Sequence, residues 1–238
     1  MAKQQRVVIV GGGVIGLLTA FNLAAEVEHV VLLDRSGVGQ ESSWAGGGIV
    51  SPLYPWRYNP AVTALAHWSQ DFYPQLADRL FTTTGVDPEV HTTGLYWLDL
   101  EDEEQALAWA QREGRPLSAV EIPAVEQAVP VLGRGYSRAI YMADVANVRN
   151  PRLVKSLKAA LHGMANVTIH EQCEVQGFIR EGSTIVGVNT ARGEIRGDHV
   201  VLSAGAWSRR SMTVSSTCKS AKPRSAASAW SAPSTIRR

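Results

Sequence analysis

The sequence has 238 residues and a mass of 25.7 kDa, enough for one large domain or two small ones with a buried core. Hydrophobic residues make up 45% and charged residues 19%, and its two cysteines cannot form a disulfide scaffold, so we expect a globular protein of the reducing cytoplasm. The net charge is +1, yet seven of the 23 Lys and Arg residues follow residue 208, which leaves 16 basic and 22 acidic residues before it. No apolar run approaches the roughly 20 residues of a membrane helix, so we expect no membrane partner.

The first 34 residues predict one α/β unit. Arg6–Val10 and Val30–Leu33 are short runs of aliphatic residues, and between them Gly11–Gly13 precede a helical stretch over Val14–Ala25. Continuous apolar runs of this kind are typical of parallel strands that are covered on both faces. We therefore expect an α/β protein built on a Rossmann-like, doubly wound sheet.

The middle of the chain predicts a less regular α+β part. The expected elements are a Gly- and Ser-rich loop over Ser36–Pro55, a helix over Ala61–Thr83 after Pro60, a strand over Thr93–Leu100, a helix from Glu101–Glu104 to about Arg112, and an irregular stretch with a short helix over Pro116–Pro130. The four acidic residues at the helix start are expected to lie in solvent, because carboxylates favour the positive end of a helix dipole. The aromatic residues Tyr54, Trp56 and Tyr58 are expected to pack, although they can also line a substrate pocket.

The last third predicts a β-meander inserted before a core strand. The expected elements are strands over Ser137–Met142, Val167–His170, Val175–Arg180, Thr184–Thr190 and His199–Ser203, and a helix over Pro151–His162. A tight turn at Glu181-Gly182 joins Val175–Arg180 to Thr184–Thr190, and a second turn at Ala191–Gly193 leads into a short further strand. The buried run over His199–Ser203 then returns to the main sheet.

The motif Gly11-x-Gly13-x-x-Gly16 follows a strand and opens a helix, and Asp34 ends the next strand. In such a unit the first glycine permits a tight turn, the second lets the backbone approach a pyrophosphate, and the third lets the helix pack on the strand. The helix N-terminus offers free N–H groups to phosphates, and the acid accepts hydrogen bonds from a ribose diol. The pattern therefore predicts a bound dinucleotide, either NAD or FAD.

Four segments of the sequence resemble one family. Val7–Gly16 (VVIVGGGVIG), Ser42–Gly48 (SSWAGGG) and Ser203–Ser208 (SAGAWS), with Asn147–Leu153 (NVRNPRL), are similar to the D-amino-acid oxidase group of FAD-dependent oxidoreductases, and within it to its bacterial glycine oxidase branch of thiamine biosynthesis. The resemblance covers about Gln5 to Ser208. It implies FAD as the cofactor, a possible homo-oligomer, and the loss of the family's C-terminal part.

The resemblance also implies a set of FAD-binding residues. They are Gly11, Gly13, Val14, Ile15 and Gly16 at the pyrophosphate, Asp34 and Arg35 at the adenosine ribose, Ser42 and Ser43 at a phosphate, Ala45, Gly46, Gly47, Gly48 and Ile49 beside the flavin ring, Val175 at the adenine, and Ala204, Gly205 and Trp207 at the closing strand end. Taken one by one, these positions also have plain structural interpretations: the serines can cap a helix, Val175 can be strand core, and Gly205 can be a turn. The implied domains are 1–58 with 150–208 for FAD and 59–149 as a partial substrate domain.

The implied reaction is oxidation of the amine of glycine, sarcosine or a small D-amino acid by FAD and dioxygen, with hydrogen peroxide as a product. The sequence itself indicates no catalytic acid, base or nucleophile, and no metal site. His170 and Cys173 have the spacing of half a metal site, but positions i and i+3 of a strand face opposite sides. Cys173 is expected to be a small buried strand residue.

The last 30 residues differ in composition from the rest. Residues 209–238 contain seven basic and no acidic residues, eight Ser and three Thr, and no apolar periodicity. We interpret them as an aberrant, disordered tail that is not an evolved nucleic-acid arm. Because the family's substrate-binding arginine has no counterpart here, a catalytically inactive FAD-binding fragment remains an alternative, as do an NAD-dependent dehydrogenase and a nucleic-acid binder.

Overall fold

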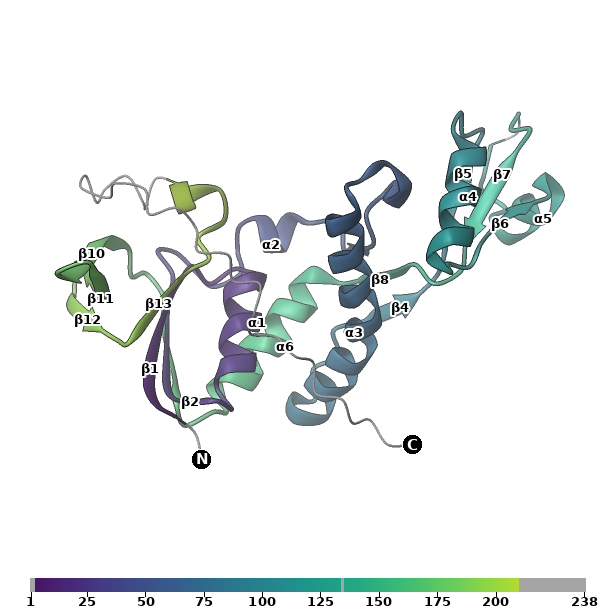
Figure 1. Cartoon of the computed structure of the whole chain (residues 1–238). Helices are drawn as coiled ribbons and strands as arrows, with labels where there is room; N and C mark the ends of the chain where they lie inside the picture. The colour runs from purple at the N-terminus through teal and green to yellow at the C-terminus, as the bar shows by residue number, and fades with distance from the viewer. Residues whose placement is uncertain (1–2, 134, 210–238) are drawn as a thin grey trace.

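A parallel sheet forms one end of the molecule in the computed structural model, which describes residues 3–133 and 135–209 (Figure 1). The strand order is β13-β1-β2-β9, all parallel. The strands are β1 (Lys3–Val10), β2 (Val27–Leu33), β9 (Val167–His170) and β13 (His199–Leu202). The carboxyl ends of β1 and β2 therefore lie side by side, Val10 beside Leu33.

The sheet is covered on both faces, which confirms the expectation from its apolar runs. Helices α1 (Val14–Leu23) and α6 (Asn150–His162) pack on Val7, Ile9, Val30 and Leu32. The alternate residues of the same strands face an antiparallel meander. It consists of β10 (Val175–Glu181), β11 (Thr184–Thr190) and β12 (Gly193–Arg196), so the predicted meander before the last core strand is also confirmed. We call these elements the nucleotide region.

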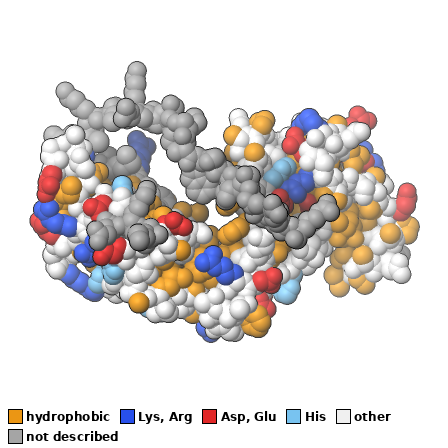
Figure 2. All heavy atoms as spheres, turned by 60° about the horizontal axis from the view of Figure 1, so that its bottom comes forward, with side chains coloured by type: hydrophobic (Ala, Val, Ile, Leu, Met, Phe, Trp, Pro, Cys, Tyr) orange, Lys and Arg blue, Asp and Glu red, His pale blue; other side chains and the backbone are white. Residues whose placement is uncertain are grey.

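The long helix α3 (Pro60–Thr84) lies against the nucleotide region in the middle of the molecule (Figure 1). It begins where the Asn59 side chain accepts a hydrogen bond from the N–H of Ala61, and it ends at Gly85, which has the left-handed conformation that terminates helices. Leu76 and Leu80 pack into the same core as α1 and α6. Hydrophobic side chains also reach the surface over much of the face drawn in Figure 2, and those exposed on α3 are Val62, Leu65, Trp68 and Phe81.

Two small antiparallel sheets follow. The first joins β3 (Ile49–Val50), β8 (Ala146–Val148) and β4 (Val90–Thr92), with β8 in the centre. The second joins β5 (Leu95–Leu98), β7 (Ala139–Met142) and β6 (Leu117–Val120), with α4 (Glu103–Glu113) and α5 (Ile122–Ala128) beside it (Figure 1). We call this second sheet with α4 and α5 the outer region. Its core contains Trp97, Trp109, Ile140 and Met142, together with Trp56.

Several predictions for the middle of the chain are wrong in detail. The predicted strand over Thr93–Leu100 is shorter and consists of β5 (Leu95–Leu98), because Gly94 adopts a φ of +70° where the chain passes from β4 to β5 in another sheet. Pro116–Pro130 is more regular than expected, since it contains β6 and α5. The predicted loop over Ser36–Pro55 contains the short helix α2 (Ser42–Ala45) and β3, and a 3₁₀ turn over Pro55–Arg57 follows. These elements are short, and their pairing partners are remote in sequence.

Asp102 differs from the prediction that the four acidic residues at this helix start lie in solvent. It directly precedes α4, which begins at Glu103, and its side chain has specific partners. Its carboxylate accepts hydrogen bonds from Arg57 at 2.7 and 2.8 Å and from the indole N–H of Trp56 at 2.8 Å. The Arg57 hydrogen bonds, with a smaller contribution from Trp56, lower the pKa of Asp102 to about 2. The residue thus ties the outer region to the segment that precedes α3.

Candidate dinucleotide site

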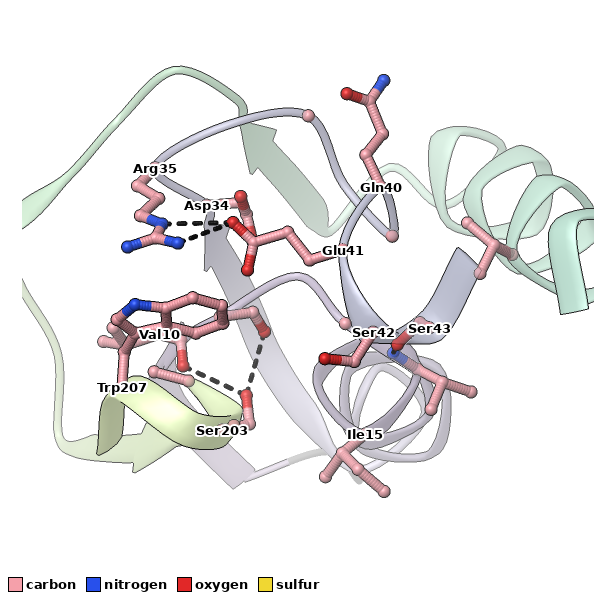
Figure 3. A pocket seen from close by; sticks show the side chains of 18 of the residues that line it. Val10, Ile15, Asp34, Arg35, Gln40, Glu41, Ser42, Ser43, Ser203 and Trp207 are labelled. Carbon is pink, nitrogen blue, oxygen red and sulfur yellow. Dashed lines mark hydrogen bonds and ion pairs between the residues drawn. The ribbon is translucent and has the colours of Figure 1, made fainter. Parts of the chain in front are cut away.

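A cavity of about 460 Å³ opens at the carboxyl ends of β1 and β2 (Figure 3). Its wall is formed by the turn after β1, the segment between β2 and α2, the start of β10 and the residues that follow β13. Ligands of open parallel sheets bind at this edge, because the strand ends leave a crevice there. Its position is therefore what the glycine motif and Asp34 predict for a dinucleotide.

The glycine turn brings backbone against backbone. Gly11 has a φ of +108°, and a Cβ there would lie 2.5 Å from the carbonyl oxygen of Ser203. A Cβ on Gly16 would lie 1.9 Å from the carbonyl oxygen of Gly11. Side chains at either position would separate α1 from β1 and β13, so the glycines keep the helix start at the edge of the cavity.

The N-terminus of α1 offers a donor to the cavity. The N–H of Val14 donates to the hydroxyl of Ser43 at 2.8 Å. Ser43 and Ser42 both line the cavity, and α1 is ten residues long, so its positive dipole end lies at this wall. The Ser43 hydroxyl can keep this bond and donate its own proton to a phosphate oxygen.

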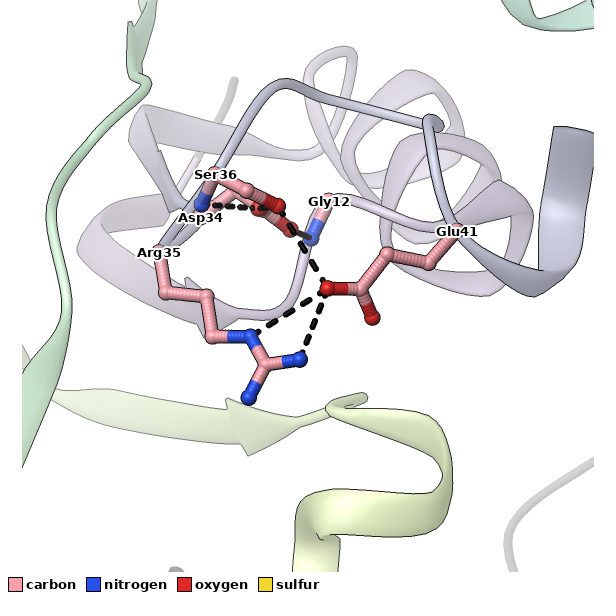
Figure 4. A network of polar contacts seen from close by, with 5 residues as sticks. All are labelled: Gly12, Asp34, Arg35, Ser36 and Glu41. Carbon is pink, nitrogen blue, oxygen red and sulfur yellow. Dashed lines mark hydrogen bonds and ion pairs between the residues drawn. The ribbon is translucent and has the colours of Figure 1, made fainter.

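Asp34 holds the turn together from the end of β2. One carboxylate oxygen accepts from the N–H of Gly12 at 2.7 Å, and the other accepts from the N–H of Ser36 at 2.8 Å and from its hydroxyl at 3.1 Å (Figure 4). These bonds fix the carboxylate at the rim of the cavity. The oxygen that accepts from Gly12 keeps a lone pair that a ribose hydroxyl can use.

Arg35 lies across the mouth of the cavity. Its guanidinium donates to one oxygen of Glu41 at 2.7 and 3.2 Å, and its central carbon lies 4.0 Å from the centroid of the Trp207 ring (Figures 3 and 4). Glu41 directly precedes α2, and Trp207 belongs to a 3₁₀ turn over Gly205–Trp207. Three segments that are distant in sequence therefore meet at this point.

The cavity brings together most of the predicted FAD-binding residues. Those that line it are Gly11, Gly13, Val14, Ile15, Asp34, Arg35, Ser42, Ser43, Val175, Ala204, Gly205 and Trp207. Gly16 lies behind the wall in the contact of α1 with the turn, and Ala45, Gly46, Gly47, Gly48 and Ile49 lie outside the cavity. The contact of each residue with FAD stays a prediction.

The cavity wall also contains residues that the sequence reasoning missed. They include Gln40, Glu41, Tyr73, Asn150, Glu174 and Ser203. Glu41 and Gln40 precede the two predicted serines, and Asn150 belongs to a segment that carries the family resemblance, so proximity could have suggested them. Tyr73 comes from α3, and burial raises the pKa of its phenol. No local pattern indicates that α3 crosses this wall.

The glycines after α2 contact a different part of the molecule. A Cβ on Gly48 would lie 2.1 Å from the carbonyl oxygen of Val148, and Gly46 lies against the side chain of Asn150. Gly46 and Gly47 line a second hollow of about 360 Å³ beside β8 and the start of α6. The predicted position of this loop beside a flavin ring is not tested by these contacts.

Other candidates have structural positions. Trp56 is 6% exposed in the core of the outer region, which confirms its predicted packing role, whereas Tyr58 is 48% exposed. Cys173 is buried, but it follows β9 instead of lying in a strand, and its N–H donates to the carbonyl of Asp34 at 2.8 Å. Within residues 3–133 and 135–209, no group of three or more His, Cys, Asp or Glu could hold a metal ion, and no helix is long and apolar enough to cross a membrane.

The parallel sheet, the glycine turn at a helix start and the fixed acid at the next strand end define a dinucleotide-binding α/β protein. A family profile described as "DAO: FAD dependent oxidoreductase" matches residues 6–225, so the chain belongs to this family of FAD-dependent oxidoreductases. The match runs beyond Ser208, the predicted end of the resemblance. The predicted tail over 209–238 lies outside the described residues, except for Arg209.

The relatives are consistent with this family. Glycine oxidase of Pseudomonas putida is 72% identical over 87% of this chain and 56% of its own length, and glycine oxidase of Pseudomonas aeruginosa is 64% identical over 86% and 56%. The crystal structure of glycine oxidase from Bacillus cereus superimposes with a TM-score of 0.79, at 30% identity, over 88% of this chain and 58% of that one. The chain thus spans about 56% of the length of these curated relatives.

The residues present fit the family's cofactor. The cavity holds a backbone cradle that a Cβ would fill, a helix N–H with a serine hydroxyl, and a fixed carboxylate at the strand end. These are the three groups that a dinucleotide needs at its pyrophosphate and ribose. Among the described residues of the wall, Arg35 is the one Lys or Arg, and Glu41 neutralises it.

Proposed function

We propose that the chain binds FAD in the cavity at the ends of β1 and β2, and that it belongs to an oxidase acting on the amine of glycine, sarcosine or a small D-amino acid. The observation that carries the proposal is the convergence of the Gly11 turn, the Val14 N–H with Ser43, and Asp34 on one cavity. The names and high identity of the Pseudomonas relatives support glycine as the first substrate to test. On the same grounds we propose thiamine biosynthesis as the context and dioxygen as the second substrate.

The chain's own residues would bind and orient the cofactor. The hydroxyls of Ser42 and Ser43 would meet phosphate oxygens, with Ser43 held by the N–H of Val14, and Asp34 would accept hydrogen bonds from the ribose. When bound, FAD supplies the hydride acceptor for amine oxidation. We assign 1–58 with 150–208 to FAD binding and 59–149 to part of a substrate domain, while α3 contributes Leu76 and Leu80 to the core of the nucleotide region.

The second candidate is an FAD-binding protein without oxidase turnover. It is consistent with the coverage of the relatives, because the chain spans about 56% of the length of the Pseudomonas glycine oxidases. The two candidates make the same prediction for FAD binding and opposite predictions for peroxide formation.

The test is reconstitution followed by turnover. The purified 238-residue chain is incubated with FAD and desalted, its visible spectrum is recorded, and peroxide is then measured with glycine, sarcosine and D-alanine. Retained flavin bands with peroxide support the oxidase, and retained bands without peroxide support the second candidate. A colourless protein that also gives no flavin binding by titration contradicts both. NAD in place of FAD is the control for an NAD-dependent dehydrogenase.

We also propose a cytoplasmic location and a homo-oligomer, both by analogy with the family. Size-exclusion chromatography with light scattering tests the second proposal. A monomer at all concentrations would contradict it.

A further inference from the structure

The contact of Arg35, Glu41 and Trp207 closes one side of the cavity with side chains from three elements (Figures 3 and 4). Two hydrogen bonds of the guanidinium go to the same oxygen of Glu41, at 2.7 and 3.2 Å. The planar guanidinium is therefore held in one orientation over the indole. All three residues line the cavity, so a ligand there meets a flat wall whose charge is already compensated.

This wall stands at the nucleoside end of the site. Asp34, the ribose acceptor, immediately precedes Arg35, and the Ser36 hydroxyl lies 3.1 Å from Asp34 and 3.5 Å from the Glu41 oxygen that Arg35 contacts (Figure 4). The proposed phosphate donor Ser43 contacts the start of α1 instead, where its hydroxyl accepts from the N–H of Val14. Glu41 is thus linked to the ribose position through Ser36 and to the serines through the chain, since α2 begins at Ser42.

Two roles for Arg35 make different demands on Glu41. If the guanidinium were a counter-ion for the pyrophosphate, Glu41 would weaken binding, because it competes for the same charge and adds a negative one. If the guanidinium serves as a planar surface for the purine, Glu41 strengthens binding by fixing its orientation. The short ion pair and the position of the guanidinium carbon, 4.0 Å from the centroid of the Trp207 ring, favour the second role.

We infer that Glu41 is a positioning residue of this site: it holds the Arg35 guanidinium flat on Trp207, so that the pair forms the wall for the adenosine moiety of the cofactor. The inference rests on the proposed binding of FAD. The ligand class is the ADP portion of a dinucleotide. Arg35 acts here as a stacking surface and not as a phosphate counter-ion.

The experiment is a double-mutant cycle on ligand binding. Dissociation constants for FAD, ADP and FMN are measured by flavin fluorescence and calorimetry for the wild type, Glu41→Gln, Arg35→Ala and the double variant. Glu41→Gln should weaken FAD and ADP about tenfold, or 1.4 kcal/mol, and leave FMN unchanged. In the Arg35→Ala background the same substitution should cause no further weakening, because Glu41 acts through Arg35.

The salt dependence of ADP binding distinguishes the two roles of Arg35, and a purely structural role would not change it. The slope of log Kd for ADP against log salt should be equal in the wild type and in the double variant Arg35→Ala/Glu41→Gln, since the ion pair as a whole carries no net charge. The matched control is Glu181→Gln, which removes another ion pair, 2.6 Å from Arg196 on the meander, and should leave all three ligands unaffected.

The outcomes separate this inference from the proposed function. Unchanged or tighter ADP binding by Glu41→Gln, equal weakening in both Arg35 backgrounds, or a smaller salt slope in the double variant would each overturn the positioning role. A wild-type chain that binds neither FAD nor ADP removes the proposed function, and the inference with it. If circular dichroism shows that Glu41→Gln does not fold, ADP binding by Arg35→Lys is the deciding measurement. This variant keeps the positive charge and loses the planar guanidinium, so unchanged ADP binding would overturn the inference.

Discussion

The nucleotide region and the outer region differ in the chemical groups that hold their functional contacts. In the nucleotide region the decisive contacts are backbone ones: the Gly11 turn against Ser203, the Gly16 backbone against Gly11, and the N–H of Gly12 on Asp34. In the outer region they are large side chains, with Trp56 5.3 Å from Trp97 and 6.3 Å from Trp109 between ring centroids. Backbone contacts demand particular residues at fixed spacing, whereas aromatic packing can be built in many ways.

The sequence of the nucleotide region therefore indicates its ligand, whereas the sequence of the outer region does not. A glycine turn before a helix and an acid after the next strand are restricted in residue type, because together they must fit one dinucleotide, the turn its phosphates and the acid its ribose. The tryptophans of the outer region fill a core, and their polar atoms are satisfied internally: Trp97 donates to the carbonyl of Leu53 at 3.0 Å and Trp56 donates to Asp102. Substitutions in the two regions should therefore have separable effects on FAD binding and on stability.

Gly16→Ala should have the largest effect. Its Cβ would lie 1.9 Å from the carbonyl oxygen of Gly11, where only backbone movement can relieve the overlap. We expect a loss of more than about 4 kcal/mol of stability and no retained FAD. Thermal unfolding and the flavin spectrum measure both. Gly177→Ala is the control, because a Cβ there meets nothing within 4 Å.

Trp97→Ala should destabilise the outer region strongly and affect the cofactor little. Trp97 is 6% exposed, and its removal leaves a cavity and an unpaired carbonyl on Leu53. We expect a cost of about 3 to 4 kcal/mol. Hydrogen exchange should increase in β5 and β7 and stay unchanged in β1 and β2. A loss of FAD affinity as large as that of Gly16→Ala would show that the regions are not separable.

Asp34→Asn should reduce FAD affinity more than stability. The amide keeps one acceptor and loses the charge that strengthens the bonds from Gly12 and Ser36. We expect about tenfold weaker FAD binding, equivalent to one hydrogen bond to a charged group. Flavin titration measures it, with Glu174→Gln as the matched control at the same cavity. Because both variants remove one negative charge, equal losses would contradict a specific hydrogen-bonding role for Asp34.

Asp102→Asn should have the smallest effect, and a pH-dependent one. Arg57 first, and Trp56 second, stabilise the ionised carboxylate and lower its pKa to about 2. The stability that this pKa shift contributes is therefore present above about pH 4 and is lost as the pH falls toward 2. We expect the melting temperature at pH 7 to fall by about 2–4 °C in the variant. The difference should vanish near pH 2. Glu103→Gln is the control, and a difference that persists at pH 2 would contradict the assignment.

The sequence could predict the nucleotide region closely because its elements are continuous. The runs Arg6–Val10 and Val30–Leu33, the helix after Gly13 and the meander strands each carry their own periodicity and their own turn residues. The middle of the chain was predicted less well. Its strands β4, β6 and β8 are three or four residues long and pair only with segments remote in sequence, so no local pattern distinguishes them from loops.

By itself, the sequence determined the parallel sheet, the meander, the glycine turn and the class of ligand, because turn geometry and strand burial restrict residue type locally. Tertiary structure alone decided that Tyr73 of α3 borders the cavity, that Asp102 pairs with Arg57, and that Glu41 holds Arg35 on Trp207. These contacts join residues whose pairing depends on where whole elements pack. Charged and aromatic side chains at a surface satisfy many partners equally well, so only the fold selects one.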